Sequence, residues 1–407
     1  MNKFSQLFFT TLFPFLPLLA WFFSLFTERP IEIFISLIAV PIALYLLLSS
    51  TINLPRYLLF LMLFTFYHLG SAFIINPVLS FSWILFILSD NFVLACVLFF
   101  IIENTHFDDR FIIKMNRNIL FIVLITLLVS LLQIKFPSFF VSPKIALDPD
   151  NIYFSENRIF SIYSWLDLNS LGITFPILIA IMLSLYSNKK STLSLLIISG
   201  IVVSFLTKSR YVMMSAIIVF SQLFFTAKIN LKKKVYILLI FTVSVFIFLN
   251  ISKVIGYDIQ QVIDDRILER NSNMGSAKTR ILSYYVFLKV FPDHPIFGVG
   301  PETKLEVIRS LGGRAPLIHV GYLSYLYFYG LAGSFLLFLS MFYLLKDNWS
   351  IGRKQGFWGG FYGLLSFCFA NATMVYFNFS EMGIILIIIY LKYFKEKYSL
   401  KLSELET

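Results

Sequence analysis

The sequence is poor in charge for its length. Only 14% of its 407 residues are Asp, Glu, Lys or Arg, whereas 58% are apolar, and the mean hydropathy is +0.82. A soluble domain of this size needs many more polar residues to cover its surface. The composition therefore excludes a soluble globular protein and indicates a membrane protein.

Cysteine is also scarce. The two cysteines, Cys96 and Cys368, both lie in apolar runs, where we expect them to pack as small buried hydrophobes. Cysteines so few and so placed neither form a disulfide framework nor supply a metal cluster.

The chain has instead a series of apolar runs of roughly 18 to 22 residues, long enough to cross a hydrocarbon core of about 30 Å as helices. The first run, Phe8 to Phe26, is too long for a signal peptide and lacks a small-residue cleavage site, so we interpret it as an uncleaved span. The pattern predicts an all-α polytopic membrane protein with about twelve transmembrane helices in a single domain over residues 1–407. The predicted spans are residues 6–26, 31–50, 57–75, 82–102, 112–133, 168–186, 192–207, 211–227, 234–251, 317–345, 357–374 and 378–394.

Basic residues predict the orientation of these spans. They recur at the N-terminus and in every second short loop, and such loops are typically cytoplasmic. An even number of spans places both termini on that side. Retention of these loops beside anionic lipid accounts for the net charge of +11, so we expect no nucleic acid as a partner.

Two long segments fall on the opposite, extracytoplasmic side. Residues 134–167 form the first of these loops, and residues 252–316, between spans nine and ten, form the larger one, which is long enough to carry function. Lys208 and Arg210 also lie on this side, in a tight turn where loop length does not explain them. These two cations either reach up to the phosphates of the outer leaflet or hold an anionic substrate.

Other polar candidates lie on the same side. Arg158 precedes the sixth span, and Arg280 begins an amphipathic stretch that we expect to lie along the membrane surface. A turn rich in Pro and Gly follows at 292–301 and contains His294. His319 is the last polar side chain before the tenth span. Arginine pairs bidentately with phosphate oxygens, and histidine can accept a proton near neutral pH.

These residues carry a resemblance. The turn Lys208-Ser209-Arg210, the run from Arg280 through His294-Pro295-Ile296-Phe297-Gly298-Val299-Gly300-Pro301, and His319 before a span with Tyr329-Gly330-Leu331-Ala332-Gly333 resemble the core of the O-antigen ligase and O-antigen polymerase superfamily. The resemblance covers about residues 150–345 by motif, and the rest by topology. Family members often have Asn after the histidine, whereas this chain has Val320.

The resemblance implies a metal-independent, inverting glycosyltransferase of the GT-C type that uses no cofactor. Its donor would be a glycan on undecaprenyl diphosphate. Arg158, Arg210, Arg280 and Lys208 would bind the diphosphate, the arginines Arg210 and Arg280 would also act in catalysis, and His319 would be the catalytic base. His294 in its turn and His68 inside the third span are candidates for supporting roles.

An acidic pair, Asp148 and Asp150, is similar to the pair that binds a metal and nucleotide sugar in other glycosyltransferases. It lies on the extracytoplasmic side, where nucleotide sugars are not expected. We interpret it as a solvated turn and predict no metal site.

Three functions stay open at this point. A polymerase that joins O-antigen or exopolysaccharide repeat units is favoured, because Gly298-Val299-Gly300-Pro301 is more similar to polymerase members. A ligase that delivers glycan to lipid A-core or to a protein has the same kind of donor. A flippase for lipid-linked sugars is disfavoured, because we find no internal repeat and because Lys and Arg avoid the span centres. We further expect a bacterial inner-membrane location with the active site facing the periplasm or cell exterior, contacts with membrane lipids, and association with other polysaccharide assembly proteins.

Overall fold

The computed structural model describes residues 2–26, 31–49, 52–75, 81–141, 159–163, 168–226, 231–254, 275–301, 318–372 and 379–406. Within these ranges the chain is helical and has no β-strand, so the predicted all-α class is confirmed. Arg158, Asp148, Asp150 and most of the predicted loops 134–167 and 252–316 lie outside the described residues.

The helices follow the predicted apolar runs. Those before residue 140 are α1 (Asn2–Leu7), η1 (Phe8–Leu12), η2 (Phe13–Phe15), α2 (Leu16–Ser24), α3 (Ile31–Ser49), α4 (Arg56–Ile75), α5 (Phe81–Ser89), α6 (Asn91–Glu103) and α7 (Asp109–Lys135). Those after it are η3 (Ser161–Tyr163), α10 (Leu168–Tyr186), α11 (Lys190–Leu206), α12 (Arg210–Phe225), α13 (Leu231–Val254), α15 (Gly275–Val290), η5 (Phe291–Asp293), α17 (Gly321–Gln355), α18 (Gly359–Asn371) and α19 (Met382–Glu406).

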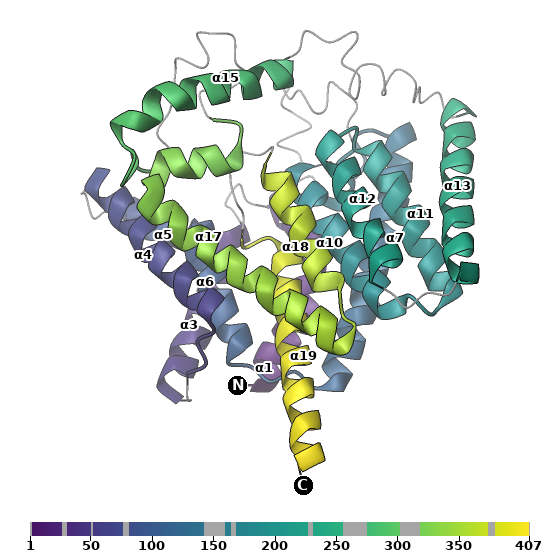
Figure 1. The fold of residues 1–407 in the computed structure, drawn as a ribbon, viewed down its shortest axis with the longest axis horizontal. Helices are drawn as coiled ribbons and strands as arrows, with labels where there is room; N and C mark the ends of the chain where they lie inside the picture. The colour runs from purple at the N-terminus through teal and green to yellow at the C-terminus, as the bar shows by residue number, and fades with distance from the viewer. Residues whose placement is uncertain are drawn as a thin grey trace.

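Two helices form the centre of the bundle. The side chains of Ile177–Leu183 in α10 and of Ile384–Leu391 in α19 are buried on every face of the helix, as expected for helices in the interior of a large bundle. By contrast, α3 and α13 lie at the periphery (Figure 1) and expose large apolar side chains such as Leu48 and Leu239. An apolar surface of this kind suits contact with lipid.

The described helices include several that are long and apolar enough to cross a membrane. Five satisfy both criteria singly, and the bent pair α5 and α6 makes a sixth if it is one span. Shorter apolar helices are present at Ser170–Tyr186, Lys190–Leu206, Arg210–Phe225 and Lys234–Phe246. The protein is therefore a multi-pass membrane protein, and the number of twelve spans stays a prediction.

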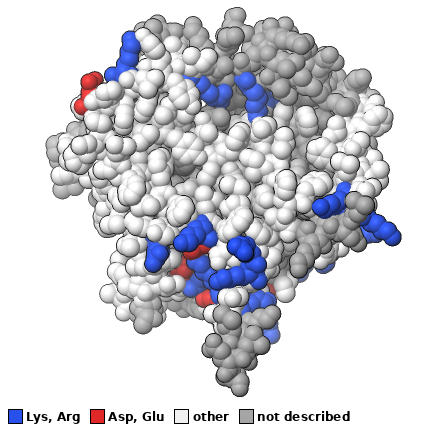
Figure 2. Space-filling model, in the orientation of Figure 1, with Lys and Arg blue, Asp and Glu red and all other residues white. Residues whose placement is uncertain are grey.

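The two ends of the bundle carry different features. Both termini lie at one end, and α15 lies across the other, which we call the α15 end (Figure 1). Figure 2 shows Lys and Arg near both ends of the visible face, with a broad band of uncharged surface between them. Such a band is expected of a membrane-spanning protein, because Lys and Arg are costly in hydrocarbon. The cytoplasmic location of the termini stays a prediction.

The first predicted span is not one regular α-helix. Residues Phe8–Leu12 form a π-helix and Phe13–Phe15 a 3-10 turn before α2 begins. Pro14 and Pro17 lie in this region, and each lacks the backbone N–H that a continuous helix requires.

A second departure occurs in the run predicted as one span at 82–102. This run forms two helices, α5 and α6, and the angle between them at the break next to Asp90 is 54°. Asp90 is the N-cap of α6, and its Oδ1 accepts hydrogen bonds from the backbone N–H groups of Phe92 and Val93 at 3.0 and 2.9 Å. The first N–H groups of a helix have no partner within it. Asp90 therefore supplies the acceptors that make a helix start possible inside an apolar run.

A third departure lies within α17, predicted as one span at 317–345. Gly330 has φ +60° and ψ −165°, which interrupts the helix. The carbonyl groups just before the break are satisfied from outside the helix. The Val299 N–H donates to the Tyr327 carbonyl at 3.0 Å, and the Gly300 N–H donates to the Phe328 carbonyl at 2.8 Å.

The same segment also satisfies the start of the second half of α17. The Leu331 N–H donates to the Pro295 carbonyl at 2.9 Å, and the Ala332 N–H donates to the Ile296 carbonyl at 3.0 Å. Residues 295–300 therefore bridge both sides of the break. Buried backbone polar groups need such partners, especially where water is excluded.

Two glycines permit this close approach. Gly298, with φ +71°, and Gly330 face each other across the contact. A Cβ added to Gly330 would lie 2.3 Å from the Ile296 carbonyl oxygen, and one added to Gly298 would lie 2.4 Å from the Phe328 carbonyl oxygen. Both close neighbours are backbone atoms, which cannot move aside as a flexible side chain can. Glycine is therefore required at both positions for backbone conformation and for space.

We predict that Gly298→Ala and Gly330→Ala each destabilise the protein strongly. An alanine at positive φ costs roughly 1–2 kcal/mol, and the backbone clash adds to this cost. The measurement is the thermal unfolding midpoint of purified protein in detergent.

Two other glycines provide matched controls. Gly356 also has positive φ but has open space around an added Cβ, and Gly70 is helical with open space. Gly356→Ala should show the cost of strain alone, and Gly70→Ala should be neutral or slightly stabilising. Equal midpoints for Gly330→Ala and Gly356→Ala would contradict the proposed close packing.

Candidate active site

The turn between α11 and α12 presents two cations. Lys208 has φ +52°, and its backbone N–H donates to the Phe205 carbonyl at 3.1 Å as α11 ends. Arg210 is the first residue of α12. Both side chains are half-buried, so they lie against the bundle and are not fully extended into solvent.

This turn lies at the α15 end of the bundle. The carboxylate of Glu381, directly before α19, accepts hydrogen bonds from Ser170 Oγ at 2.7 Å and Thr174 Oγ1 at 3.1 Å near the start of α10. α10 and α19 therefore begin at the same end, opposite the C-terminus (Figure 1). Because short turns connect α10, α11 and α12, α12 begins where α10 begins. Lys208 and Arg210 thus share the end of the bundle at which α15 lies.

His319 contacts α15 through its backbone. It lies just before α17, and its N–H donates to Ser283 Oγ of α15 at 2.9 Å. Ser283 is wholly buried, and its hydroxyl also donates to the Thr279 carbonyl at 2.7 Å. Arg280 is half-buried and lies three residues before Ser283, so the two share one side of the helix. The structure therefore brings the helix face that carries Arg280 to His319.

His294 contributes to the turn that follows α15 through its backbone. Its N–H donates to the Phe291 carbonyl at 3.1 Å, and its carbonyl accepts from the Gly298 N–H at 3.1 Å, while its side chain is exposed. A supporting role for the His294 side chain stays a prediction.

Part of the predicted site lies beyond the described residues. Arg158 is among these, so its place beside the other arginines stays a prediction. In the described ranges, no group of three or more His, Cys, Asp or Glu residues is arranged to hold a metal ion. Asp148 and Asp150 fall outside those ranges.

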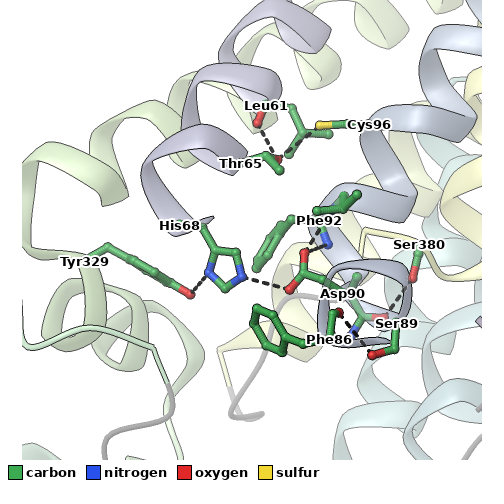
Figure 3. A network of polar contacts seen from close by, with 12 residues as sticks. Leu61, Thr65, His68, Phe86, Ser89, Asp90, Phe92, Cys96, Tyr329 and Ser380 are labelled. Carbon is green, nitrogen blue, oxygen red and sulfur yellow. Dashed lines mark hydrogen bonds and ion pairs between the residues drawn. The ribbon is translucent and has the colours of Figure 1, made fainter. Parts of the chain in front are cut away.

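A buried polar network at His68 was not predicted from the sequence. His68 Nε2 lies 2.8 Å from Asp90 Oδ2, and His68 Nδ1 lies 2.7 Å from the Tyr329 hydroxyl (Figure 3). His68 is 4% exposed and Tyr329 3%. The network joins α4, the break between α5 and α6, and the break in α17.

Besides His68 itself, which lies inside the third predicted span, the sequence gave one further signal of this network. Ser89-Asp90-Asn91 is a polar triplet inside an otherwise apolar run, and a carboxylate in such a run requires a partner. A hydropathy average over some 19 residues dilutes three polar positions. The sequence also does not show that Asp90 pairs with His68, or that Tyr329 contacts the other nitrogen of the ring.

Comparison with known families supports the predicted resemblance. Residues 193–338 match the family model described as O-antigen ligase. The match extends from α11 into the second half of α17 and includes Lys208, Arg210, Arg280, the 295–300 segment and His319. No curated protein matches the chain significantly.

The match over these residues supports the O-antigen ligase and polymerase superfamily that the motifs predicted. The class of the protein follows from this family and from its apolar helices: it is a membrane enzyme of the glycan-transferase type.

We predict that Ser283→Ala loosens the segment around His319. The substitution removes the Ser283 acceptor of the part-buried His319 N–H, and a typical hydrogen bond contributes about 0.5–1.5 kcal/mol to stability. Amide hydrogen exchange in a peptide that contains residues 318–325 should become roughly tenfold faster, which corresponds to about 1.4 kcal/mol.

The matched control is Ser244→Ala in α13. Ser244 is also buried and donates to the carbonyl four residues earlier, that of Ile240, at 2.6 Å. It tests the loss of a buried serine hydroxyl away from His319. Unchanged exchange at 318–325 in Ser283→Ala would show that this hydrogen bond does not hold the segment.

Proposed function

We propose that the protein transfers a glycan from undecaprenyl diphosphate to the hydroxyl of an acceptor sugar, and that it polymerises the repeat units of O-antigen or of an exopolysaccharide. The observation that carries this proposal is the location of Lys208, Arg210, the Arg280-bearing helix and His319 at one end of the bundle. All of them fall within the residues matched by the family model.

The proposed reaction has a simple balance of bonds. The acceptor oxygen forms a bond to the anomeric carbon of the donor as the bond from that carbon to the diphosphate oxygen breaks. The electron pair leaves with the diphosphate, and attack from the opposite face inverts the anomeric centre. The proton of the acceptor hydroxyl passes to His319. General base catalysis of this kind raises the rate by about 10²–10⁴-fold.

The basic residues stabilise the leaving group in this proposal. Arg210 and Arg280 donate paired hydrogen bonds to the phosphate oxygens as their charge grows, and Lys208 adds a point charge. Arg158 is proposed to join them. In a partly dehydrated site, each such contact lowers the activation barrier by about 2.7–4 kcal/mol. Because these cations neutralise the leaving group, the proposal includes neither a metal ion nor a cofactor.

The acceptor distinguishes the two candidate enzymes. A polymerase adds the growing chain to another lipid-linked repeat unit, whereas a ligase delivers it to lipid A-core or to a protein. The sequence Gly298-Val299-Gly300-Pro301 favours the polymerase, because it is more similar to that branch of the superfamily. In either case we propose a bacterial inner membrane with cytoplasmic termini and an active site that faces the periplasm.

The first experiment measures transfer by purified protein from an undecaprenyl diphosphate-linked glycan. Arg210→Ala and Arg280→Ala should each lower the rate by about 10²–10³, because each removes stabilisation of the departing charge. His319→Ala should lower it by at least about 10². The thermal midpoints of these variants should stay close to that of the unaltered protein.

The matched control for the arginines is Lys289→Ala. Lys289 is an exposed cation on the same helix as Arg280 and lies over the Tyr285 ring, so its removal should leave transfer unchanged. A chelator should also have no effect. Full activity of Arg210→Ala and Arg280→Ala would refute the diphosphate site, and loss of activity with chelator would indicate a metal.

A deletion strain separates polymerase from ligase. Loss of long glycan with single repeat units still attached to lipid A-core is the result expected for a polymerase. Loss of all attached glycan would indicate a ligase instead. A glycan profile identical to that of the parent strain would contradict both the polymerase and the ligase.

A further inference from the structure

The His68 network connects two helix breaks through a helix that is itself unbroken. Asp90 stands at the break between α5 and α6, and Tyr329 is the last residue before the break at Gly330 in α17. His68 reaches both from α4 (Figure 3). Two interruptions that are distant in the sequence thus share one imidazole.

The partners of the imidazole determine where its hydrogen lies. Asp90 Oδ1 accepts two backbone N–H bonds, and Asp90 Oδ2 faces His68 Nε2 at 2.8 Å. Because a carboxylate only accepts, Nε2 carries the hydrogen. In the neutral ring Nδ1 then accepts from the Tyr329 hydroxyl. His68 therefore acts as a donor on one side and an acceptor on the other.

Tyr329 ends a short helix that begins beside His319. The residues Gly321–Tyr329, which we call the half-helix, span about 12 Å at 1.5 Å per residue. Ser324 of the half-helix donates to the Ile318 carbonyl, which ties the residue before His319 to it. A change of tilt at Tyr329 therefore moves His319 at the other end.

A second residue of α4, Tyr67, also contacts the backbone next to the Gly330 break. The Tyr67 hydroxyl lies 2.8 Å from the Phe297 carbonyl and 3.2 Å from the Tyr329 carbonyl. Tyr67 thus contacts the backbone of the 295–300 segment and the last residue before the break. His68, the next residue, contacts the Tyr329 side chain.

Stability alone does not account for this network. The backbone groups at the Gly330 break are already satisfied by residues 295–300. Replacing both partners of a buried hydrogen bond by apolar groups of the same shape can be nearly neutral or stabilising, and ionisable groups are rare inside membrane helices unless they serve a function. Orientation of the half-helix is a role that an apolar contact performs poorly, because it lacks direction.

We propose that His68, held between Asp90 and Tyr329, is a positioning residue that sets the direction of the half-helix and thereby the placement of His319 for glycan transfer. This inference rests on the proposed function for its activity readout. It assigns the N-terminal spans, through α4 and the α5–α6 break, a direct part in arranging the site.

The test compares kcat and KM of His68→Leu with those of His68→Gln in the lipid-linked donor assay. Leucine fills similar space without hydrogen bonds, and glutamine retains one donor and one acceptor. We expect kcat to fall at least tenfold in His68→Leu, with KM for the donor within about threefold, because the diphosphate contacts come from other helices. His68→Gln should recover kcat to within about threefold of the unaltered protein, and Tyr329→Phe should lower it in the same direction as leucine.

The matched control is Ser340→Ala. The Ser340 hydroxyl donates to the Tyr57 carbonyl at 2.8 Å. This hydrogen bond also joins α17 to α4, but it lies in the part of α17 that follows Gly330. Its loss should leave kcat unchanged. Equal losses in His68→Leu and Ser340→Ala would overturn the proposal, because they would indicate a general weakening of the α4–α17 contact. Unchanged kcat in His68→Leu would overturn it as well.

Hydrogen exchange separates failure of this inference from failure of the proposed function. His68→Leu should speed exchange in residues 318–329, and Ser340→Ala should not, whether or not the protein transfers glycan. If the unaltered protein shows no transfer yet this exchange difference is present, the positioning contact stands and the proposed function fails. If transfer is normal and exchange at 318–329 is unaffected by His68→Leu, the positioning contact fails and the function stands.

Discussion

The structure depends on one constraint: a helix that breaks inside a membrane-spanning bundle must find partners for its freed backbone groups without water. In α17 the break at Gly330 frees carbonyl groups on one side and N–H groups on the other, and residues 295–300 satisfy both. The segment after α15 is thereby fixed against the first third of a long helix. Two glycines make the approach possible because only hydrogen atoms separate the two backbones.

The same constraint explains why polar side chains lie inside the bundle. At the break between α5 and α6, a side chain replaces the missing backbone acceptors, and Asp90 caps α6. A capping carboxylate has a second oxygen, and in an apolar environment that oxygen needs a donor too. His68 meets this need, and the other nitrogen of its ring requires a partner in turn, which is the Tyr329 hydroxyl. The break between α5 and α6 is thus connected to the break in α17 by the chain of contacts from Asp90 through His68 to Tyr329.

The sequence predicted the helices well and the breaks poorly, for physical reasons. Apolar runs of bilayer length specify helices wherever they occur, because the backbone has few alternatives in lipid. A glycine in such a run gives a weaker signal. Gly330 and Gly333 are three residues apart in the same span, but Gly330 breaks the helix, whereas Gly333 stays helical and packs against the Tyr67 ring. Their difference depends on residues 295–300, about thirty positions earlier, which local pattern cannot reveal.

The predictability of the site follows the same division. Lys208 and Arg210 stood out because they oppose a rule about short loops, which is a local property, whereas the partner of His68 depends on how three helices meet. Because the break at Gly330 separates the half-helix from the rest of α17, the position of His319 depends on short-range contacts with Ser283, residues 295–300 and α4. His68 and Asp90 lie outside the family match at 193–338. The N-terminal spans are therefore more than an anchor, since they supply one of the surfaces against which the matched domain is aligned.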